Sequence, residues 1–178
     1  MTDAAFKDKN FTRAIVIASI GKSKSEVVAG LNERDVYSHK FSLGSQTMDT
    51  AIIEHFRQNL GLLIGKRTSE AIRIALGSAS PEDDTLTMDV RGRDVEERVP
   101  RLVTVNEAEI SAAILEVVAE IVGEIQTAVD RVFAETQTEI EHFGVVLKGE
   151  GGWLRGLDKR VSVATKLFVV VSDEAYEE

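Results

Sequence analysis

Residues 144–158 read GVVLKGEGGWLRGLD, and this stretch decides the fold. Its apolar start predicts a buried strand, because a short apolar run that ends at turn residues is typical of one. Gly149, Gly151 and Gly152 then predict a tight turn, since glycine adopts backbone angles that other residues rarely reach. Residues 154–158, LRGLD, begin a short helix. A strand, a glycine-rich turn and a short helix therefore follow one another in this stretch.

The size and charge of the chain narrow the classes of protein it can belong to. It has 178 residues and a formal net charge of −9, which fits one domain, or one domain with a small insertion. The acidic excess argues against nucleic acid and against an anionic membrane surface as partners, because both are bound through clustered Lys and Arg. The chain contains no Cys, which excludes disulfides, thiolate catalysis and zinc–thiolate sites.

No segment suggests a membrane span or a secretion signal. A transmembrane helix needs about 20 apolar residues in a row, and no run approaches that length. Residues 1–10, MTDAAFKDKN, are polar and lack the apolar core of a signal peptide. We therefore expect a cytoplasmic protein whose residues 1–10 form a disordered lead-in.

Three short segments near the start predict strands. Residues 13–19 and 25–31 are rich in apolar and β-branched side chains, and residues 36–43 alternate between apolar and polar. The connections between them are too short to hold crossover helices, so the three strands are expected to form an antiparallel meander.

Two helices are predicted next. Apolar residues repeat at four-residue spacing over 48–60, and Gly61 ends that helix. A shorter helix over 68–76 has Thr68 as its expected N-cap and Gly77 at its end.

A small α/β insertion is expected over about 62–105. It contains the second helix and two further strands, at 85–91 and 99–105. We interpret it as part of one domain rather than as an independent one.

The longest predicted element is a helix over 107–134. Its apolar residues recur at the spacing of one helix face, with Val118 near the middle. Asn106 before the helix and Glu109 three residues later resemble a capping box, in which Asn replaces the usual Ser or Thr. A strand over 143–147, the glycine-rich turn and a last strand near 167–171 complete the pattern.

Five blocks of the chain together resemble the MreB family of bacterial actins, in which similar blocks occur in the same order and spacing. The blocks are MDTAII at 48–53, LLIGKRTSE at 62–70, MDVRGRD at 88–94, VPR at 99–101 and the segment 144–158. The resemblance runs from about residue 13 to residue 173.

The resemblance implies an α/β fold, the second domain of an actin-like ATPase. That domain has a ribonuclease-H-like mixed sheet flanked by helices, here over 11–178, with the insertion at about 62–105. The family's first domain, with its first phosphate loop, catalytic acid and membrane-inserting elements, would lie upstream. A closing helix of the family would follow the last strand.

One nucleotide motif of the family falls on the turn at 19–24. The family pattern is Asp-Ile-Gly-Gly-Gly-Thr, whereas this chain reads SIGKSK. Ser19 replaces the Asp that helps organise the metal and its waters, and Lys22 and Ser23 replace two glycines that let backbone N–H groups approach phosphates. Gly21 remains. The segment is interpreted either as a plain hairpin turn or as a turn whose lysines still attract an anion.

The second nucleotide motif falls on the turn at 148–152. Gly149, Gly151 and Gly152 match the family, whereas Lys148 and Glu150 replace its Thr and middle Gly. A carboxylate at Glu150 would face phosphates unfavourably unless a cation intervenes. The glycines then serve turn geometry, or they remain as vestigial nucleotide contacts together with Gly21.

A third departure lies at 44–47, where Gly-Ser-Gln-Thr replaces a Gly-Gly-Asp-Lys-type stretch and removes another acid near the cleft. No metal site is expected, because His39, His55 and His142 lack ligand-like spacing.

These features favour a non-catalytic, actin-like cytoskeletal interaction protein linked to cell shape. We expect no ATPase activity, no required cofactor and at most weak ATP or ADP binding. The expected partner is an MreB-type filament or a second copy of the chain. One alternative is a nucleotide-binding filament subunit completed by a separate first domain. Another is a decayed gene fragment.

Overall fold

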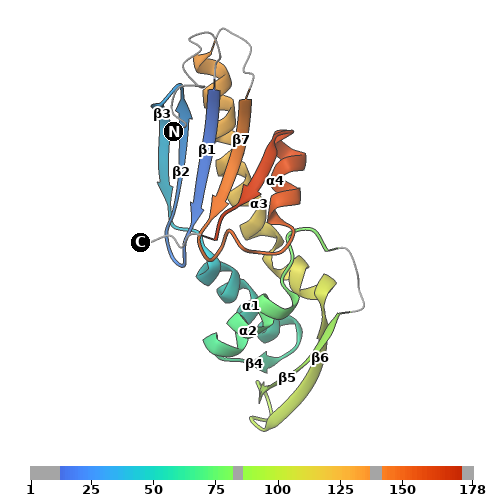
Figure 1. Cartoon of the computed structure of the whole chain (residues 1–178). Coiled ribbons are helices and arrows are strands. Elements are labelled where there is room, and N and C mark those ends of the chain that lie inside the picture. Colours follow the sequence, from blue (N-terminus) through green and yellow to red (C-terminus); the bar gives the residue numbers. More distant parts are fainter. Residues whose placement is uncertain (1–12, 82–85, 137–141, 174–178) are drawn as a thin grey trace.

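The protein is described from a computed structural model, which covers residues 13–81, 86–136 and 142–173. It contains two sheets, one of five strands and one of three (Figure 1). The larger sheet lies at one end of the molecule and the smaller sheet at the other, with helices α1 (Ser45–Asn59) and α2 (Lys66–Leu76) between them. The predicted disordered lead-in, residues 1–10, lies outside the described residues.

The larger sheet is mixed, as predicted. Its strand order is β3-β2-β1-β7-β8, with the first three strands antiparallel and β7 and β8 parallel to β1. The antiparallel meander is therefore confirmed. The strands are β1 (Arg13–Ile20), β2 (Ser25–Leu31), β3 (Arg34–Phe41), β7 (His142–Lys148) and β8 (Phe168–Val171).

Helix α3 (Glu107–Glu135) forms the centre of the core. It contacts β1, β2 and β3 along one face of the sheet (Figure 1). Val16, Ala18 and Ile20 alternate along β1 and are fully buried. The predicted N-cap is confirmed, because Asn106 Oδ1 accepts a hydrogen bond from the backbone N–H of Glu109 at 2.8 Å. The Glu109 carboxylate contacts His55 Nε2 at 2.9 Å.

The smaller sheet consists of β4, β5 and β6, all antiparallel. The strands are β4 (Leu62–Leu63), β5 (Thr87–Asp94) and β6 (Pro100–Asn106). Helices α1 (Ser45–Asn59) and α2 (Lys66–Leu76) pack against each other beside it, and α4 (Leu157–Thr165) packs on α3 and β8. The boundaries of the inserted subdomain, about 62–105, stay a prediction.

Two local predictions need correction. The N-cap of α2 is Gly65 and not Thr68, because the backbone N–H of Ser69 already bonds the carbonyl of Gly65 at 3.0 Å. Lys66 and Arg67 are good helix formers, so the helix begins before the residue with the best capping side chain. The two-residue strand β4 was not predicted, because two apolar residues carry no periodic pattern.

Candidate functional site

Three connections meet at one end of the larger sheet. They are the β1–β2 hairpin, the start of α1 and the turn after β7. The backbone N–H of Gly151 donates to the carbonyl of Ile20 at 2.9 Å, and the N–H of Ser45 donates to the carbonyl of Gly21 at 3.1 Å. Segments that are more than a hundred residues apart in the sequence are thus hydrogen-bonded to one another.

The four glycines predicted as nucleotide contacts all lie at this place. Gly21 is in the hairpin, and the N–H of Gly152 closes the second turn on the carbonyl of Gly149 at 2.9 Å. Packing requires glycine at 151, where an added Cβ would lie 2.4 Å from Cγ2 of Ile20. Gly149 has a φ of 84°, which disfavours other residues. Contact of these glycines with a nucleotide stays a prediction.

Backbone donors here are largely engaged with the protein itself. A helix N-terminus offers unpaired N–H groups to anions. At α1, however, the N–H of Ser45 is bonded to Gly21, and the N–H of Gln46 donates to the carbonyl of Lys22 at 2.9 Å. These bonds tie the hairpin to the helix. Binding of an anion at this end of the sheet would therefore depend mainly on side-chain hydrogen-bond donors.

A buried charged cluster supplies such donors. Arg73 Nε lies 2.7 Å from Asp49 Oδ1, and Arg73 Nη2 lies 3.1 Å from Glu150 Oε1. Ser45 Oγ donates to the same Glu150 oxygen at 2.7 Å. The cluster joins α1, α2 and the turn after β7. Burial raises the pKa of the Asp49 carboxyl, and the ion pair with Arg73 opposes that rise.

Arg73 is the functional candidate that sequence reasoning missed. Glu150 was expected to face phosphates unfavourably unless a cation intervenes, and Arg73 places a cation beside its carboxylate. It lies 77 residues from Glu150 and 24 from Asp49, so no local pattern connects the three.

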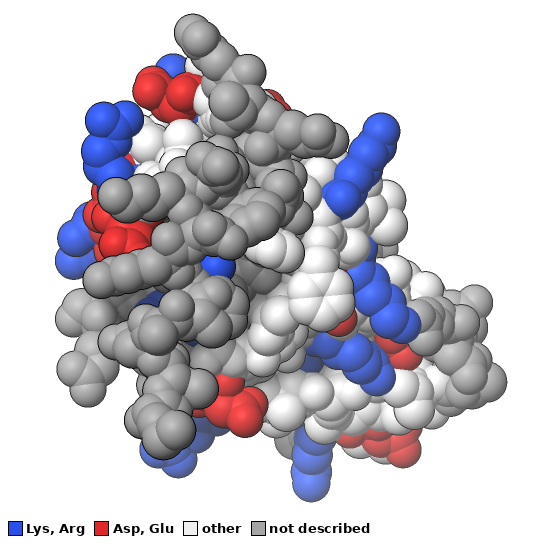
Figure 2. All heavy atoms as spheres, turned by 45° about the horizontal axis from the view of Figure 1, so that its top comes forward, with Lys and Arg blue, Asp and Glu red and all other residues white. Residues whose placement is uncertain are grey.

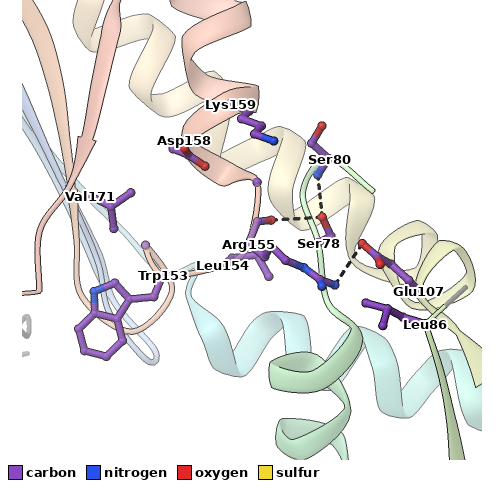
Figure 3. Close-up of a pocket in the computed structure, with 12 residues that line it drawn as sticks. Ser78, Ser80, Leu86, Glu107, Trp153, Leu154, Arg155, Asp158, Lys159 and Val171 are labelled. Atoms are coloured by element: carbon purple, nitrogen blue, oxygen red, sulfur yellow. Dashed lines mark hydrogen bonds and ion pairs between the residues drawn. The ribbon is translucent and has the colours of Figure 1, made fainter. Parts of the chain in front are cut away.

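A separate cleft of about 580 Å³ lies beside the LRGLD segment (Figure 3). Arg155 crosses it to pair with Glu107 at 3.1 Å. Ser78 Oγ donates to the carbonyl of Arg155 at 3.3 Å, which joins the loop after α2 to this segment. Of the predicted site glycines, Gly152 lines this cleft and the other three do not.

Trp153 lies on the opposite side of this cleft from Glu107 in Figure 3. Its Nε1 donates to the carbonyl of Ser172 at 2.9 Å, and the residue is 49% exposed. The indole therefore joins the turn to the segment after β8 while one part of it stays in solvent.

The MreB/Mbl protein family model matches residues 9–178 of this chain. The chain belongs to this family.

Curated and solved relatives agree with the MreB/Mbl assignment. The cell shape-determining protein MreB of Escherichia coli K12 is 36% identical over 159 residues, which cover 89% of this chain and 46% of that protein. The crystal structure of MreB 5 of Spiroplasma citri bound to AMPPNP superposes with a TM-score of 0.75 at 20% identity, over 89% of this chain and 48% of that one. The MamK double helical filament gives 0.68 at 15% identity, over 90% and 50%.

These superpositions confirm the predicted actin-like fold. The chain spans about half the length of the curated relatives it matches.

Family membership overturns one expectation. The protein was expected not to be an enzyme, whereas its MreB homologues are actin-like ATPases. The expectation rested on the altered turns at 19–24 and 148–152 and on the placement of the family's catalytic acid in its first domain, and the family assignment contradicts it.

One face of this MreB-family chain carries mixed charge on its described residues. On the face that Figure 2 shows, Lys and Arg lie beside Asp and Glu rather than in one patch. In the part of the chain that the structure describes, no helix is both long and apolar enough to cross a membrane.

The Arg155 ion pair gives the first testable prediction. The Glu107 side chain is 4% exposed, so Arg155→Ala leaves a buried carboxylate without its cation. Because Arg155 itself is 48% exposed and its pairing is screened by solvent, we expect a loss of about 1–2 kcal/mol in unfolding free energy.

Urea denaturation measures this loss, and exposed Arg67 on α2 supplies a control. Arg67→Ala should change the unfolding free energy by less than about 0.5 kcal/mol. Equal effects of the two substitutions would contradict a specific role for the Arg155–Glu107 pair.

Proposed function

We propose that this chain forms the second half of an MreB-type, actin-like cytoskeletal subunit that takes part in cell shape. It would contribute one wall of a nucleotide cleft, with a first actin-like half supplied by a further segment or a separate polypeptide. The observation that carries the proposal is the meeting of the hairpin at Gly21, the start of α1 at Ser45 and the turn at 149–152 at one end of the sheet.

The relatives support this proposal. The E. coli relative is named a cell shape-determining protein, the S. citri protein was crystallised with AMPPNP, and MamK forms a double helical filament. For this chain, the proposed assembly follows the same principle. Copies associate with one another or with complete actin-like subunits along a filament.

A second candidate function is binding to an existing actin-like filament without a need for nucleotide. It is favoured by Glu150, whose carboxylate is bonded to Ser45 and Arg73 at 2.7 and 3.1 Å within the site. The nucleotide dependence of filament binding distinguishes the two. If this chain acts as a filament subunit, its binding should change when ATP is replaced by ADP. If it binds filaments without a need for nucleotide, its binding should be equal in both.

A co-pelleting assay with E. coli MreB tests the association. We expect the chain to sediment with MreB filaments in a saturable manner and to stay in the supernatant when MreB is omitted. Light scattering over a concentration series measures self-association in parallel. A chain that remains monomeric and stays in the supernatant at every MreB concentration would contradict both candidate functions.

A further inference from the structure

The strongest unexplained feature is the convergence of two buried donors on one oxygen. Ser45 Oγ and Arg73 Nη2 both donate to Glu150 Oε1, at 2.7 and 3.1 Å. Ser45 is fully buried and Arg73 is 5% exposed. The Glu150 side chain, in contrast, is 37% exposed. Glu150 is therefore the solvent-facing member of an otherwise buried group.

A hydroxyl and a guanidinium that point at one oxygen form an arrangement that also suits phosphate. Guanidinium groups bind carboxylate and phosphate through the same fork of N–H donors. In this chain, the carboxylate comes from the protein itself. Asp49 holds the other side of Arg73 at 2.7 Å, so two acids surround one cation. An added anion meets net negative charge unless Glu150 moves away.

We propose that Glu150 is a specificity-determining residue that competes with anionic ligands for Ser45 and Arg73. A phosphate-bearing ligand has to displace the carboxylate and lose two charge-assisted hydrogen bonds that the free protein already has. The native chain therefore binds ADP and ATP weakly, with a Kd above roughly 1 mM. The inference rests on the proposed function in one respect only, the choice of nucleotide as ligand class.

Removing the competing carboxylate should expose the two donors. Glu150→Ala leaves Arg73 held by Asp49, so the guanidinium keeps its position. We expect Glu150→Ala to bind ADP at least about ten-fold more tightly than the native chain, a change of roughly 1.4 kcal/mol. Glu150→Gln keeps the shape of the side chain and removes its charge, and an intermediate gain is expected.

Calorimetric titration with ADP, tripolyphosphate and adenosine is the test. Both phosphate-bearing probes should gain affinity in Glu150→Ala, and adenosine should not. The double variant Glu150→Ala with Arg73→Gln should lose the gain. Glu54→Ala is the matched control, because Glu54 also pairs with an arginine, Arg57, but both side chains are about half exposed. It should leave binding unchanged.

Three results would overturn the proposal. They are micromolar ADP binding by the native chain, no gain in either Glu150 variant, or an equal gain for adenosine. Circular dichroism checks that each variant is folded, and Glu150→Gln still decides the outcome if Glu150→Ala unfolds. Co-pelleting with MreB is independent of this result. A native chain that sediments while the Glu150 variants gain no affinity refutes the competition and leaves the proposed function standing.

Discussion

Val118→Asp is expected to unfold the protein or to leave it barely stable. Val118 lies in the middle of α3 and is 1% exposed, so its replacement buries a carboxyl group without a partner. The variant loses the transfer free energy of a buried Val and adds the cost of a buried polar group, together about 4 kcal/mol or more. A loss of this size is a large part of the roughly 5–15 kcal/mol that stabilises a typical domain.

Thermal unfolding monitored by circular dichroism checks this result. Val163→Asp is a matched control, since the same substitution is made in helix α4 at a residue that is 80% exposed. It should change the unfolding free energy by no more than about 0.5 kcal/mol. If Val118→Asp keeps the native midpoint, the face of α3 that carries Val118 is not the packed core.

Elements with long hydrophobic patterns could be predicted from the sequence more accurately than elements with short ones. The helix predicted over 107–134 was confirmed within one residue, because many apolar residues at helical spacing and an Asn cap point to the same element. The start of α2 was misplaced by contrast, because its first turn carries no apolar pattern and Gly65 caps it without a side chain. Short elements such as β4 depend on the partner strand and not on their own residues.

The candidate site depends even more on contacts between segments that are distant in the sequence. Departures from the family pattern at Lys22, Ser45 and Glu150 were visible one position at a time. What they do together depends on side-chain contacts between α1, α2 and the turn after β7. Ser45 and Glu150, two departures that seemed independent, bond each other at 2.7 Å. A substitution that removes a family residue from one motif can therefore form a contact with a residue of another motif.

The second large effect is expected for Arg73→Met, which keeps an unbranched side chain as far as the position of Nε and removes the charged guanidinium. Asp49 and Glu150 then face each other's charge without a cation, and Asp49 is 7% exposed. Loss of one partner from a buried ion pair leaves an uncompensated charge, so we expect a loss of about 3 kcal/mol at neutral pH. Arg57→Met, which breaks an exposed pair with Glu54, should have a much smaller effect, because solvent screens that pair.

The pH dependence separates this charge effect from a packing defect. Because burial raises the pKa of Asp49, the folded state binds a proton on this group more readily than the unfolded state does. The stability contributed by this carboxyl therefore falls as pH rises from its ordinary pKa through the raised one. In Arg73→Met no guanidinium opposes the rise in the pKa of Asp49, so the pH range over which stability falls extends to higher pH. Urea titrations should show a smaller difference between native chain and variant at about pH 5 than at about pH 8. A difference that stays constant over this range would mean that Arg73 stabilises the fold by packing alone.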